Sequence, residues 1–363
     1  RRLMTTYKSI VGQKIQKVSS DPPAAAGGQI WYNTTKGTLR GVPILEAFSS
    51  GGNLITGRQG VGGAGTQDSG LAISGRTYPS PYVTNTEEYD GSGWATGGAV
   101  STARIYAATS KNGTQTACFI ASGTTPSPPV TSTTEEYNGT SWSSGGAVNT
   151  ARGNSIGFGT LTAGVMCGGS ADTDATEEYD GSSWTTVNNL GTARVAHGGS
   201  GIITAGLIFG GNNPSPAVIA TTEEYDGTNW TAGGDLNTGR AYITGFGIQS
   251  NSIANGGGYP SASNTIKTEG YNGTSWSNKP NSSNTRWASD SGWGASGSAG
   301  GVSGALSNSL DNVSATEEFT SSANVVTAAA WASAPALNTA RYGLSSTGTT
   351  TAAIGVGGTA GPS

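Results

Sequence analysis

The sequence has few of the side chains that build metal sites and catalytic groups. Of its 363 residues, one is His, two are Cys and two are Met, and only 11% are charged. A single His excludes most His-ligated metal sites and argues against a His-based catalytic triad. No run of about 18 apolar residues occurs, so we expect no membrane span. The thinly spread net charge of −4 argues against a nucleic-acid binder. We therefore predict a protein that is not an enzyme and has no cofactor or metal.

Glycine, in contrast, is abundant. It supplies 60 residues, more than twice its usual share of about 7%, and Ser, Thr and Asn are also frequent. Such a composition is typical of many short strands joined by tight turns, or of low complexity. The order of the residues decides between these two interpretations.

A motif of the form Thr-Glu-Glu-Tyr-Asp/Asn-Gly-x-x-Trp recurs along the chain. Successive copies of its Tyr, or of the Phe that replaces it, are 48, 42, 46, 46 and 48 residues apart. A second motif, Asn-Thr-Ala-Arg or a near copy, ends 15 residues after the Tyr and 10 after the Trp in the first five copies. The repeated positions are Glu87, Glu135, Glu177, Glu223, Glu269 and Glu317; Tyr89, Tyr137, Tyr179, Tyr225 and Tyr271; Trp94, Trp142, Trp184, Trp230, Trp276 and Trp331; and Arg58, Arg104, Arg152, Arg194, Arg240, Arg286 and Arg341.

The sixth copy departs from this spacing. Its motif reads TEEFTSS around Phe319, and Trp331 still lies 10 residues before Arg341. We therefore expect seven extra residues, forming a hairpin, between Phe319 and Trp331.

A seventh copy is split between the two ends of the chain. FSSGGNLITGR, from Phe48 to Arg58, aligns without a gap with WSSGGAVNTAR of the second copy, and IWYN places Tyr32 at the Tyr position. The residues after Arg341 run through TAAIGVGG, which resembles ITAGLIFGG before the fourth motif. We therefore expect the C-terminal end to supply the first half of a repeat and the N-terminal end to supply the second half.

Each repeat is predicted to contain four short strands, called a to d in chain order. After Arg194, strand a lies in 195–201 and strand b in 206–211, strand c carries the motif at Tyr225, and strand d starts at Trp230. Asp-Gly or Asn-Gly between c and d favours a tight hairpin. Four antiparallel strands every 42–55 residues, seven times, indicate a β-propeller.

The expected fold is therefore an all-β, seven-bladed β-propeller over residues 28–363. A composite blade, closed by both termini, would leave no open seam in the ring. Residues 1–27 would form a short N-terminal basic arm and a linker.

The repeat resembles the kelch repeat, over roughly residues 28 to 363. The best copy runs from Arg194 and His197 through Gly210–Gly211 to Tyr225 and Trp230. The resemblance implies a kelch-like propeller. It does not imply one activity, because such propellers include enzymes, adaptors and structural proteins.

Most charged side chains belong to the repeat. Of the 12 Glu residues, 11 lie in the Thr-Glu-Glu-Tyr motifs, and seven of the 11 Arg residues occupy the repeat position. One interpretation is an anion site lined by these arginines. We favour a structural one, in which a Glu such as Glu87, on the same strand face as Tyr89, forms a buried pair with an Arg between strands or blades. The Tyr and Trp residues are expected to pack between blades.

The remaining candidate groups are predicted to be structural. We expect His197 to be a hydrogen-bonded core residue, and Cys118 and Cys167 to be buried free thiols. None of the three is predicted to act in catalysis.

The loops between strands b and c are the expected recognition surface. They are long and variable, and several contain Pro-Ser-Pro, which stiffens an exposed loop and lowers the entropic cost of binding. The alternative is that they are solvated connectors. The candidate recognition residues are Tyr78, Tyr82, Pro126, Pro128, Pro214, Pro216 and Tyr259.

The N-terminal arm is the expected attachment segment. Residues 1–20 hold five of the 18 basic residues and no acidic one. MTTYKSIVGQKIQKVSSDPPA followed by GQIWYNTTKGTLRG resembles the openings of proteins from tailed phages of marine bacteria. That resemblance implies a structural or adhesive protein at a virion surface or outside cells, tail- or capsid-associated. Residues 1–27 would bind other structural proteins or copies of the chain itself. The alternatives are a self-assembling extracellular filament subunit and a glycan-binding propeller that uses the b–c loops for a host-surface glycan.

Overall fold

The computed structural model describes residues 16–20, 22, 30–35, 37–41, 44–170, 173–215, 217–258, 265–287, 291–323, 341–342, 345–349, 352–356 and 359–360. Over these residues the chain forms strands and turns and no helix, which confirms the all-β prediction for this part of the chain. By its contacts the chain divides into a unit of residues 44–323 and a second unit of residues 1–43 and 324–363.

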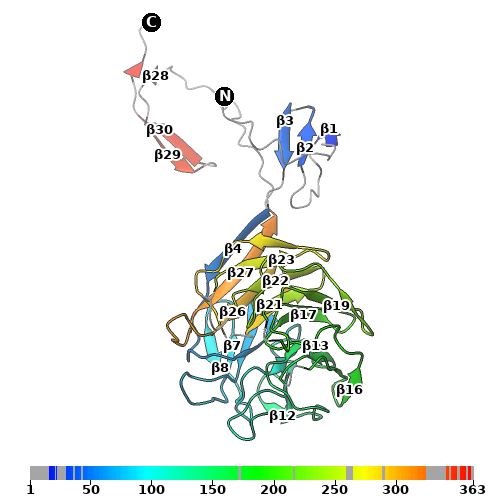
Figure 1. Ribbon diagram of the computed structural model, residues 1–363. Helices are drawn as coiled ribbons and strands as arrows, with labels where there is room; N and C mark the ends of the chain where they lie inside the picture. The colour runs from blue at the N-terminus through cyan, green and yellow to red at the C-terminus, as the bar shows by residue number, and fades with distance from the viewer. Residues whose placement is uncertain are drawn as a thin grey trace. The chain divides into compact units, whose positions relative to one another are not determined.

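The unit of residues 44–323 is a β-propeller of six four-stranded antiparallel sheets, called blades one to six (Figure 1). Blade one contains β5 (Gly62–Thr66), β6 (Ser69–Ile73), β7 (Thr86–Tyr89) and β8 (Trp94–Thr96). Blade two contains β9 (Ala108–Thr109), β10 (Cys118–Ala121), β11 (Thr134–Tyr137) and β12 (Trp142–Ser144). Blade three contains β13 (Ile156–Thr160), β14 (Ala163–Cys167), β15 (Thr176–Tyr179) and β16 (Trp184–Val187). Blade four contains β17 (Gly198–Ile202), β18 (Ala205–Phe209), β19 (Thr222–Tyr225) and β20 (Trp230–Ala232). Blade five contains β21 (Thr244–Ile248), β22 (Asn251–Asn255), β23 (Thr268–Tyr271) and β24 (Trp276–Lys279).

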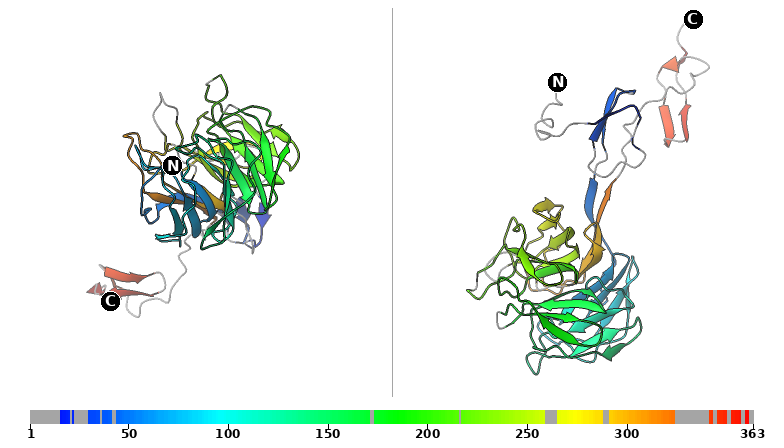
Figure 2. Two further views of the ribbon diagram at one scale, coloured as in Figure 1. Left: turned by 90° about the horizontal axis from the view of Figure 1, so that it is seen from below. Right: turned by 90° about the vertical axis from the view of Figure 1, so that its right-hand side faces the viewer.

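Blade six combines strands from distant parts of the sequence. It contains β25 (Gly292–Ser296), β26 (Ala299–Ser303), β27 (Thr316–Ala323) and, as its fourth strand, β4 (Ile44–Ser50). In the register of β27 with β4, Phe319 lies opposite Phe48, just as Tyr137 lies opposite Trp142 in blade two. Figures 1 and 2 show β4 and β27 side by side as a ribbon that extends past the neighbouring strands.

The first strand of each blade lies innermost. Strands β5, β9, β13, β17, β21 and β25 contact one another in this order, and β25 also contacts β5. The six blades therefore surround one axis.

The prediction of seven blades was wrong. Phe48 does occupy the Trp position of a repeat, as its alignment indicated, but its partner is Phe319 of the sixth motif and not Tyr32. Tyr32 instead lies on β2 (Ile30–Asn33), which pairs with two strands outside the propeller. Strand β4 supplies the fourth strand of the sixth sheet, and β27 continues past Phe319 to Ala323. The rest of the expected hairpin lies outside the described residues. Trp331 lies outside the described residues.

The hydrophobic core lies between neighbouring blades. One buried cluster joins Leu71 and Ile73 of blade one to Ile120 and Tyr137 of blade two, with Trp142 packed against it. Equivalent clusters recur at the next junctions. Fully burying a side chain such as Leu, Ile or Phe contributes about 1.5–3 kcal/mol. The aromatic residues of the repeat bury at least as much apolar area, so they stabilise the contact between blades.

The described residues of the second unit include several short strands. They are β1 (Gln16–Val18), β2, β3 (Thr38–Gly41), β28 (Arg341–Tyr342), β29 (Ser345–Thr349), β30 (Ala352–Val356) and β31 (Thr359–Ala360). Strand β1 pairs in parallel with β2, which pairs with β3, and β29 forms a hairpin with β30. The segment after Arg341, predicted to begin a composite blade, thus pairs within itself.

Candidate functional site

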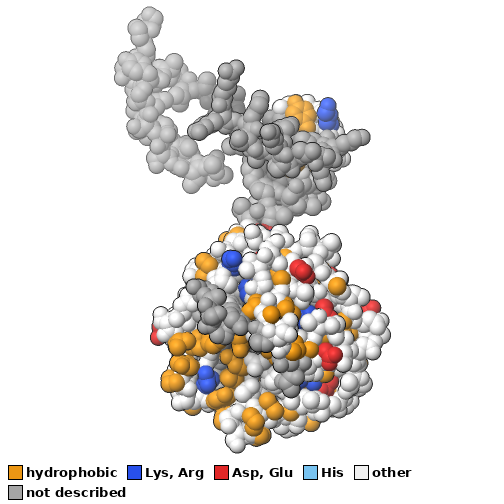
Figure 3. Space-filling model, in the orientation of Figure 1, with side chains coloured by type: hydrophobic (Ala, Val, Ile, Leu, Met, Phe, Trp, Pro, Cys, Tyr) orange, Lys and Arg blue, Asp and Glu red, His pale blue; other side chains and the backbone are white. Residues whose placement is uncertain are grey.

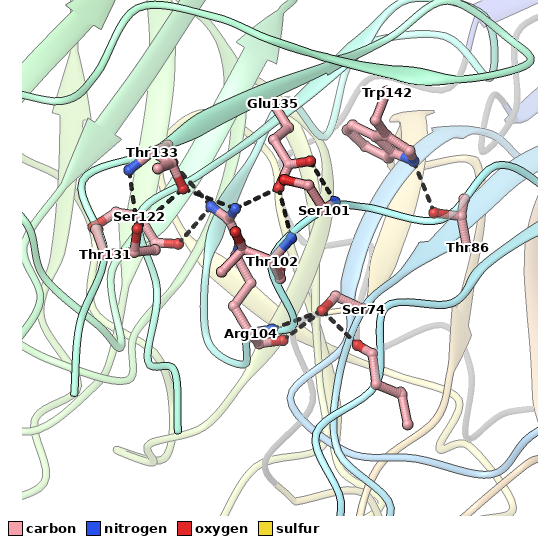
Figure 4. Close-up of polar contacts among 11 residues, drawn as sticks. Ser74, Thr86, Ser101, Thr102, Arg104, Ser122, Thr131, Thr133, Glu135 and Trp142 are labelled. Atoms are coloured by element: carbon pink, nitrogen blue, oxygen red, sulfur yellow. Dashed lines mark hydrogen bonds and ion pairs between the residues drawn. The ribbon is translucent and has the colours of Figure 1, made fainter. Parts of the chain in front are cut away.

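Each linker between two blades is fixed to the next blade by a buried Arg–Glu pair. In blade two, Arg104 lies in the linker after β8, and Glu135 lies on β11 (Figure 4). Arg104 Nη2 donates to Glu135 Oε1 at 2.6 Å, and Nη1 donates to the carbonyl oxygens of Ser122 and Thr133 at 3.1 and 2.9 Å. Glu135 also accepts a hydrogen bond from the Ser101 backbone N–H at 2.6 Å. The pair therefore ties the linker to the second and third strands of the blade.

The same pair occurs in all six blades. The pairs are Arg58–Glu87, Arg104–Glu135, Arg152–Glu177, Arg194–Glu223, Arg240–Glu269 and Arg286–Glu317. None of these side chains is more than 8% exposed. Burial lowers the pKa of the Arg104 guanidinium, and the charge of Glu135 offsets part of this effect. Each guanidinium faces the carboxylate of its own Glu, so none of the six arginines needs an anionic ligand to balance its charge, although the Nε groups of Arg152, Arg240 and Arg286 are buried without a partner. The seventh Arg of the repeat, Arg341, lies on β28 in the other unit.

A second set of contacts crosses from one blade to the next. The Tyr137 hydroxyl donates to Glu88 Oε1 of the preceding blade at 2.5 Å. Trp142 Nε1 donates to Thr86 Oγ1 at 3.0 Å, as Figure 4 shows. The equivalent contacts are Tyr89–Glu318, Tyr179–Glu136, Tyr225–Glu178 and Tyr271–Glu224, and Trp94–Thr316, Trp184–Thr134, Trp230–Thr176 and Trp276–Thr222. The contacts of Tyr89 and Trp94 reach blade six, so the series continues from blade six to blade one.

The junction between blades five and six lacks both contacts. There the Tyr is replaced by Phe319 and the Trp by Phe48, which have no donor, and the acceptor Glu is replaced by Gly270. The described residues provide an ion pair instead, because Lys279 Nζ lies 2.6 Å from Glu46 Oε1. The donor and its acceptor are thus lost together at this one junction, which we call the seam.

Five linkers are joined around the propeller axis by backbone hydrogen bonds. Gly60, Tyr106, Asn154, Ala196 and Tyr242 each lie two residues after a repeated Arg, and their φ angles lie between 52° and 63°. Within this set, each backbone N–H after that of Gly60 donates to the backbone carbonyl oxygen of the residue named before it, so that Tyr106 donates to Gly60 and Asn154 to Tyr106. The donor–acceptor distances are 2.6–3.2 Å. Non-glycine residues persist in this left-handed region only where the surrounding structure holds them. The side chains at these positions are therefore presented from a fixed backbone.

An open pocket lies among these side chains. Tyr106, Asn154, Ser155, His197 and Tyr242 are among the residues that line it. The rings of Tyr106 and Tyr242 are 6.0 Å apart between centroids. The pocket lies on the side where the linkers meet the b–c loops, as the backbone pairing of Ile105 with Thr124 shows. We call this side the loop face and the depression the axial pocket.

Several buried polar atoms at the axial pocket have no partner. They are Asn154 Oδ1, Ser155 Oγ and His197 Nδ1. His197 is a buried core residue, as predicted; its Nε2 lies 3.9 Å from Cys167 Sγ, while its Nδ1 has no protein partner. Burial, with smaller contributions from the charges of Arg194 and Lys111, holds the His197 pKa well below its ordinary value. His197 is thus neutral at neutral pH.

Sequence analysis missed this pocket. Its residues fall at the positions two and three after the repeated Arg. At the first of these positions the residues are Gly60, Tyr106, Asn154, Ala196 and Tyr242, which differ widely. Variation at one position of an otherwise regular repeat is the signal that was available. It marks a side chain that the blade itself does not constrain.

The loop face also carries the predicted recognition loops. Tyr78 is exposed and Tyr82 is half-buried, and the Arg76 guanidinium lies over both rings, 5.4 and 5.6 Å from their centroids. Asn312 in blade six holds this loop through two hydrogen bonds to the Tyr78 backbone, at 2.8 and 3.1 Å. Figure 3 shows one side of the propeller, where hydrophobic side chains gather and charged ones are sparse.

The other predicted loop residues are distributed around the face. Pro126, Pro128 and Pro214 are exposed. Pro216 and Tyr259 lie outside the described residues. The described candidate residues therefore lie on separate loops around the loop face, and they do not gather into one cluster.

Cysteine, metal and membrane features add no site. Cys118 and Cys167 are free and buried, as predicted, and burial raises both thiol pKa values, that of Cys167 to about 12. Over the residues that the structure describes, no three His, Cys, Asp or Glu side chains gather as a metal site requires. The same residues include no helix of the length and apolarity needed to cross a membrane.

The fold is similar to that of a known propeller. The solved structure of YjhT matches with a TM-score of 0.62 and 12% sequence identity, over 75% of this chain and 99% of that chain. At this identity the likeness shows the fold alone. No protein-family model matches the sequence, and no curated protein matches it.

Proposed function

We propose that this chain is a non-enzymatic adhesive protein of an extracellular assembly, such as a phage virion or tail, with its propeller as the binding part. Two features support this. The contacts divide the chain into a propeller and a second unit that holds both ends of the sequence, which gives separate parts for binding and for attachment. The repeated Arg and Glu residues, the largest set of charged groups, are used up in buried pairs.

The loop face is the observation that carries the proposal. It combines an exposed Tyr78, held by Asn312, with an open pocket whose backbone is fixed. Preformed loops on a rigid frame lower the entropic cost of binding. Binding without chemistry fits this face, because the thiol beside His197, that of Cys167, is buried and its pKa is raised by burial, which keeps it from acting as a thiolate nucleophile.

We also propose that the repeats are of the kelch type and that β4 closes the ring by completing blade six. The recurring Arg, Tyr and Trp positions and the pairing of β27 with β4 support this. Pairing the first and last strands of a ring covers their free edges.

Electron microscopy of the native source material tests the function. The adhesive role predicts ring-shaped domains repeated along a tail, a capsid or a filament. The same chain without residues 1–27 should keep the propeller and lose the attachment. Single dispersed propellers in the source material, or unchanged assembly of the truncated chain, would contradict the role of these residues.

A further inference from the structure

We propose that Arg76 and the tyrosines around it form a docking surface for a protein partner, whose contacting segment presents an Asp or Glu carboxylate beside aromatic or aliphatic side chains. This inference rests on the proposed adhesive function and names the chemistry of the partner and the part of the loop face that it contacts. It concerns a charged group that the analysis of the sequence did not single out.

Arg76 is a cation without a counter-ion. Among the arginines of residues 44–323, it alone lies outside the repeat position, and the other six each pair with a buried Glu. Arg76 lies on the b–c loop of blade one, is half-buried, and forms no ion pair with any described residue. Partners that bind specifically place opposite charges against each other. The surface therefore calls for an anionic group.

The guanidinium of Arg76 is held in place by neutral groups. It lies over the Tyr78 and Tyr82 rings. The Gln59 side-chain oxygen, in the amide orientation that suits both groups, accepts from Arg76 Nε at 3.1 Å and from Nη2 at 2.6 Å. Its Nη1 donates to no described residue and is not fully buried. A carboxylate accepts two parallel N–H bonds from an Arg, and the edge formed by Nη1 and Nη2 suits this arrangement.

The fold of the blade does not require this group. Arg76 forms backbone bridges to Gln59 and to Tyr82. In blades two, four and six, where both bridges recur, the residues at the three positions are uncharged: Ile105, Thr124 and Val130; Val195, Asn212 and Val218; and Trp287, Leu306 and Asn312. Binding residues are found most often on loops that a rigid frame positions. A charge that only one blade carries on such a loop is therefore assigned to binding.

Aromatic rings extend this surface from Tyr78 toward the axis. Burial raises the pKa of the Tyr106 hydroxyl, and the charge of Arg76 opposes part of that rise, so Arg76 lies near this ring. The Tyr242 ring lies 6.0 Å from that of Tyr106 and 5.3 Å from that of Trp287, between centroids. Tyr, Trp and Arg are the residues that carry most of the binding energy in protein interfaces.

The shape of the surface fits a protein better than a small molecule. Small-molecule sites are cavities of about 300–1,000 Å³, whereas the free space of the axial pocket beside Arg76 is about 20 Å³, room for about one water. Around it, Tyr78 and Leu310 are 38% and 49% exposed, on two loops that Asn312 joins. Apolar groups around one Arg, with few other charges, match the buried centre of a protein interface.

A display library of short random peptides, selected for binding to the full chain, tests the proposal. We expect the enriched peptides to carry Asp or Glu next to aromatic or aliphatic residues, because the site offers one cation among apolar rings. Failure to enrich any peptide would overturn the inference. Enrichment of peptides without an acidic residue would overturn it as well.

A double-mutant cycle with an enriched peptide then identifies the contact, with affinities measured by fluorescence anisotropy. Arg76→Gln should weaken binding about tenfold or more, a loss of about 1.4 kcal/mol, and so should replacing the acidic residue of the peptide by its amide. Both changes together should cost little more than either, because they remove the same contact. Tyr82→Val, which has a precedent in Val130, should also weaken binding.

Lys267→Gln is the matched control, because it removes a positive charge from another exposed b–c loop, and urea midpoints show whether each variant folds. Unchanged affinity in Arg76→Gln, or an equal loss in Lys267→Gln, would overturn the inference. Tighter binding of an oligogalacturonate, whose carboxylates are carried by sugars, would replace the protein partner by a glycan and leave the adhesive function standing. Failure of the adhesive function itself would appear separately, in the microscopy of the assembly, with peptide binding at Arg76 unchanged.

Discussion

Replacing Glu135 by Gln tests whether the buried Arg–Glu pairs hold the propeller together. The Glu135 carboxylate accepts from Arg104 at 2.6 Å and from the Ser101 and Thr102 backbone N–H groups at 2.6 and 3.3 Å. A Gln side chain has nearly the same shape, but only its oxygen accepts. Its NH₂ group must then face either the Arg104 guanidinium or a backbone N–H, and Arg104 is left as a buried charge without a counter-ion.

The expected cost of Glu135→Gln is large. Removing one partner of a buried pair costs about 3–5 kcal/mol, and single domains are stable by about 5–15 kcal/mol in total. One substitution in one blade should therefore remove about a fifth of the stability or more. Equilibrium urea unfolding, followed by tryptophan fluorescence, measures this loss.

Two further variants identify its cause. Arg104→Met combined with Glu135→Leu removes both charges, and it should recover most of the stability because no buried charge is stranded. Asp226→Asn, in the exposed turn after Tyr225, should leave the urea midpoint unchanged, since Asn138 occupies the same place in blade two. A loss below about 1 kcal/mol in Glu135→Gln would refute the reasoning, since it is less than one ordinary hydrogen bond is expected to contribute.

The hydrogen bonds between blades and the buried Glu317 carboxylate of blade six give two more predictions. Tyr137→Phe removes a hydrogen bond to the Glu88 carboxylate and should cost about 1.5–3 kcal/mol in urea unfolding. Phe319→Tyr should bring no comparable gain, because Gly270 offers no acceptor, and equal and opposite effects would contradict the assignment of the seam. For Glu317, burial raises the carboxyl pKa, but the charge of Arg286 and the hydrogen bonds outweigh it, so the pKa is lowered on folding. Its stabilisation is therefore present above the unfolded pKa of about 4.3 and lost as the pH falls through the folded pKa. Glu317→Gln should flatten the loss of urea stability between pH 5 and pH 3, and parallel curves for the two proteins would count against it.

Much of the blade could be predicted because its sequence repeats. A Glu two residues before the aromatic shares its strand face, and an Arg recurs once per blade, so a buried pair was the simplest arrangement. The structure brings these residues together within each blade, and the Tyr and Trp residues pack between blades. The second Glu of the motif was not interpreted. It lies on the opposite strand face and accepts from the Tyr of the next blade.

The number of blades was harder to predict because the sequence allows two partners for Phe48. Its alignment with a Trp position was correct, but sequence similarity does not show which strand lies beside it. The clue was that the second Glu of the fifth motif and the Tyr of the sixth are both replaced, by Gly270 and Phe319, while Glu318 is retained. Glu318 then needs a Tyr from another repeat, and Tyr89 of the first repeat supplies it only in a ring of six.

The axial pocket could not be predicted from residue types. Asn154, Ser155 and Tyr242 come from different repeats and are ordinary residues for a chain rich in Asn, Ser and Tyr. They meet only because the ring brings the same repeat position of several blades to one axis. The unpaired atoms depend on the side-chain packing around them, which no spacing in the sequence specifies.

A disulfide between β4 and β27 tests the six-bladed ring most directly. Ala47 lies opposite Thr320, and directly opposed antiparallel positions are close enough for a disulfide. Cys118 and Cys167 are buried and should not compete. With Ala47→Cys and Thr320→Cys, mild oxidation of the folded chain should link positions 47 and 320, as detected by mass spectrometry of its peptides. A seven-bladed ring would place position 33 beside position 47. A link in the variant with Asn33→Cys and Ala47→Cys, and none between 47 and 320, would contradict the six-bladed account.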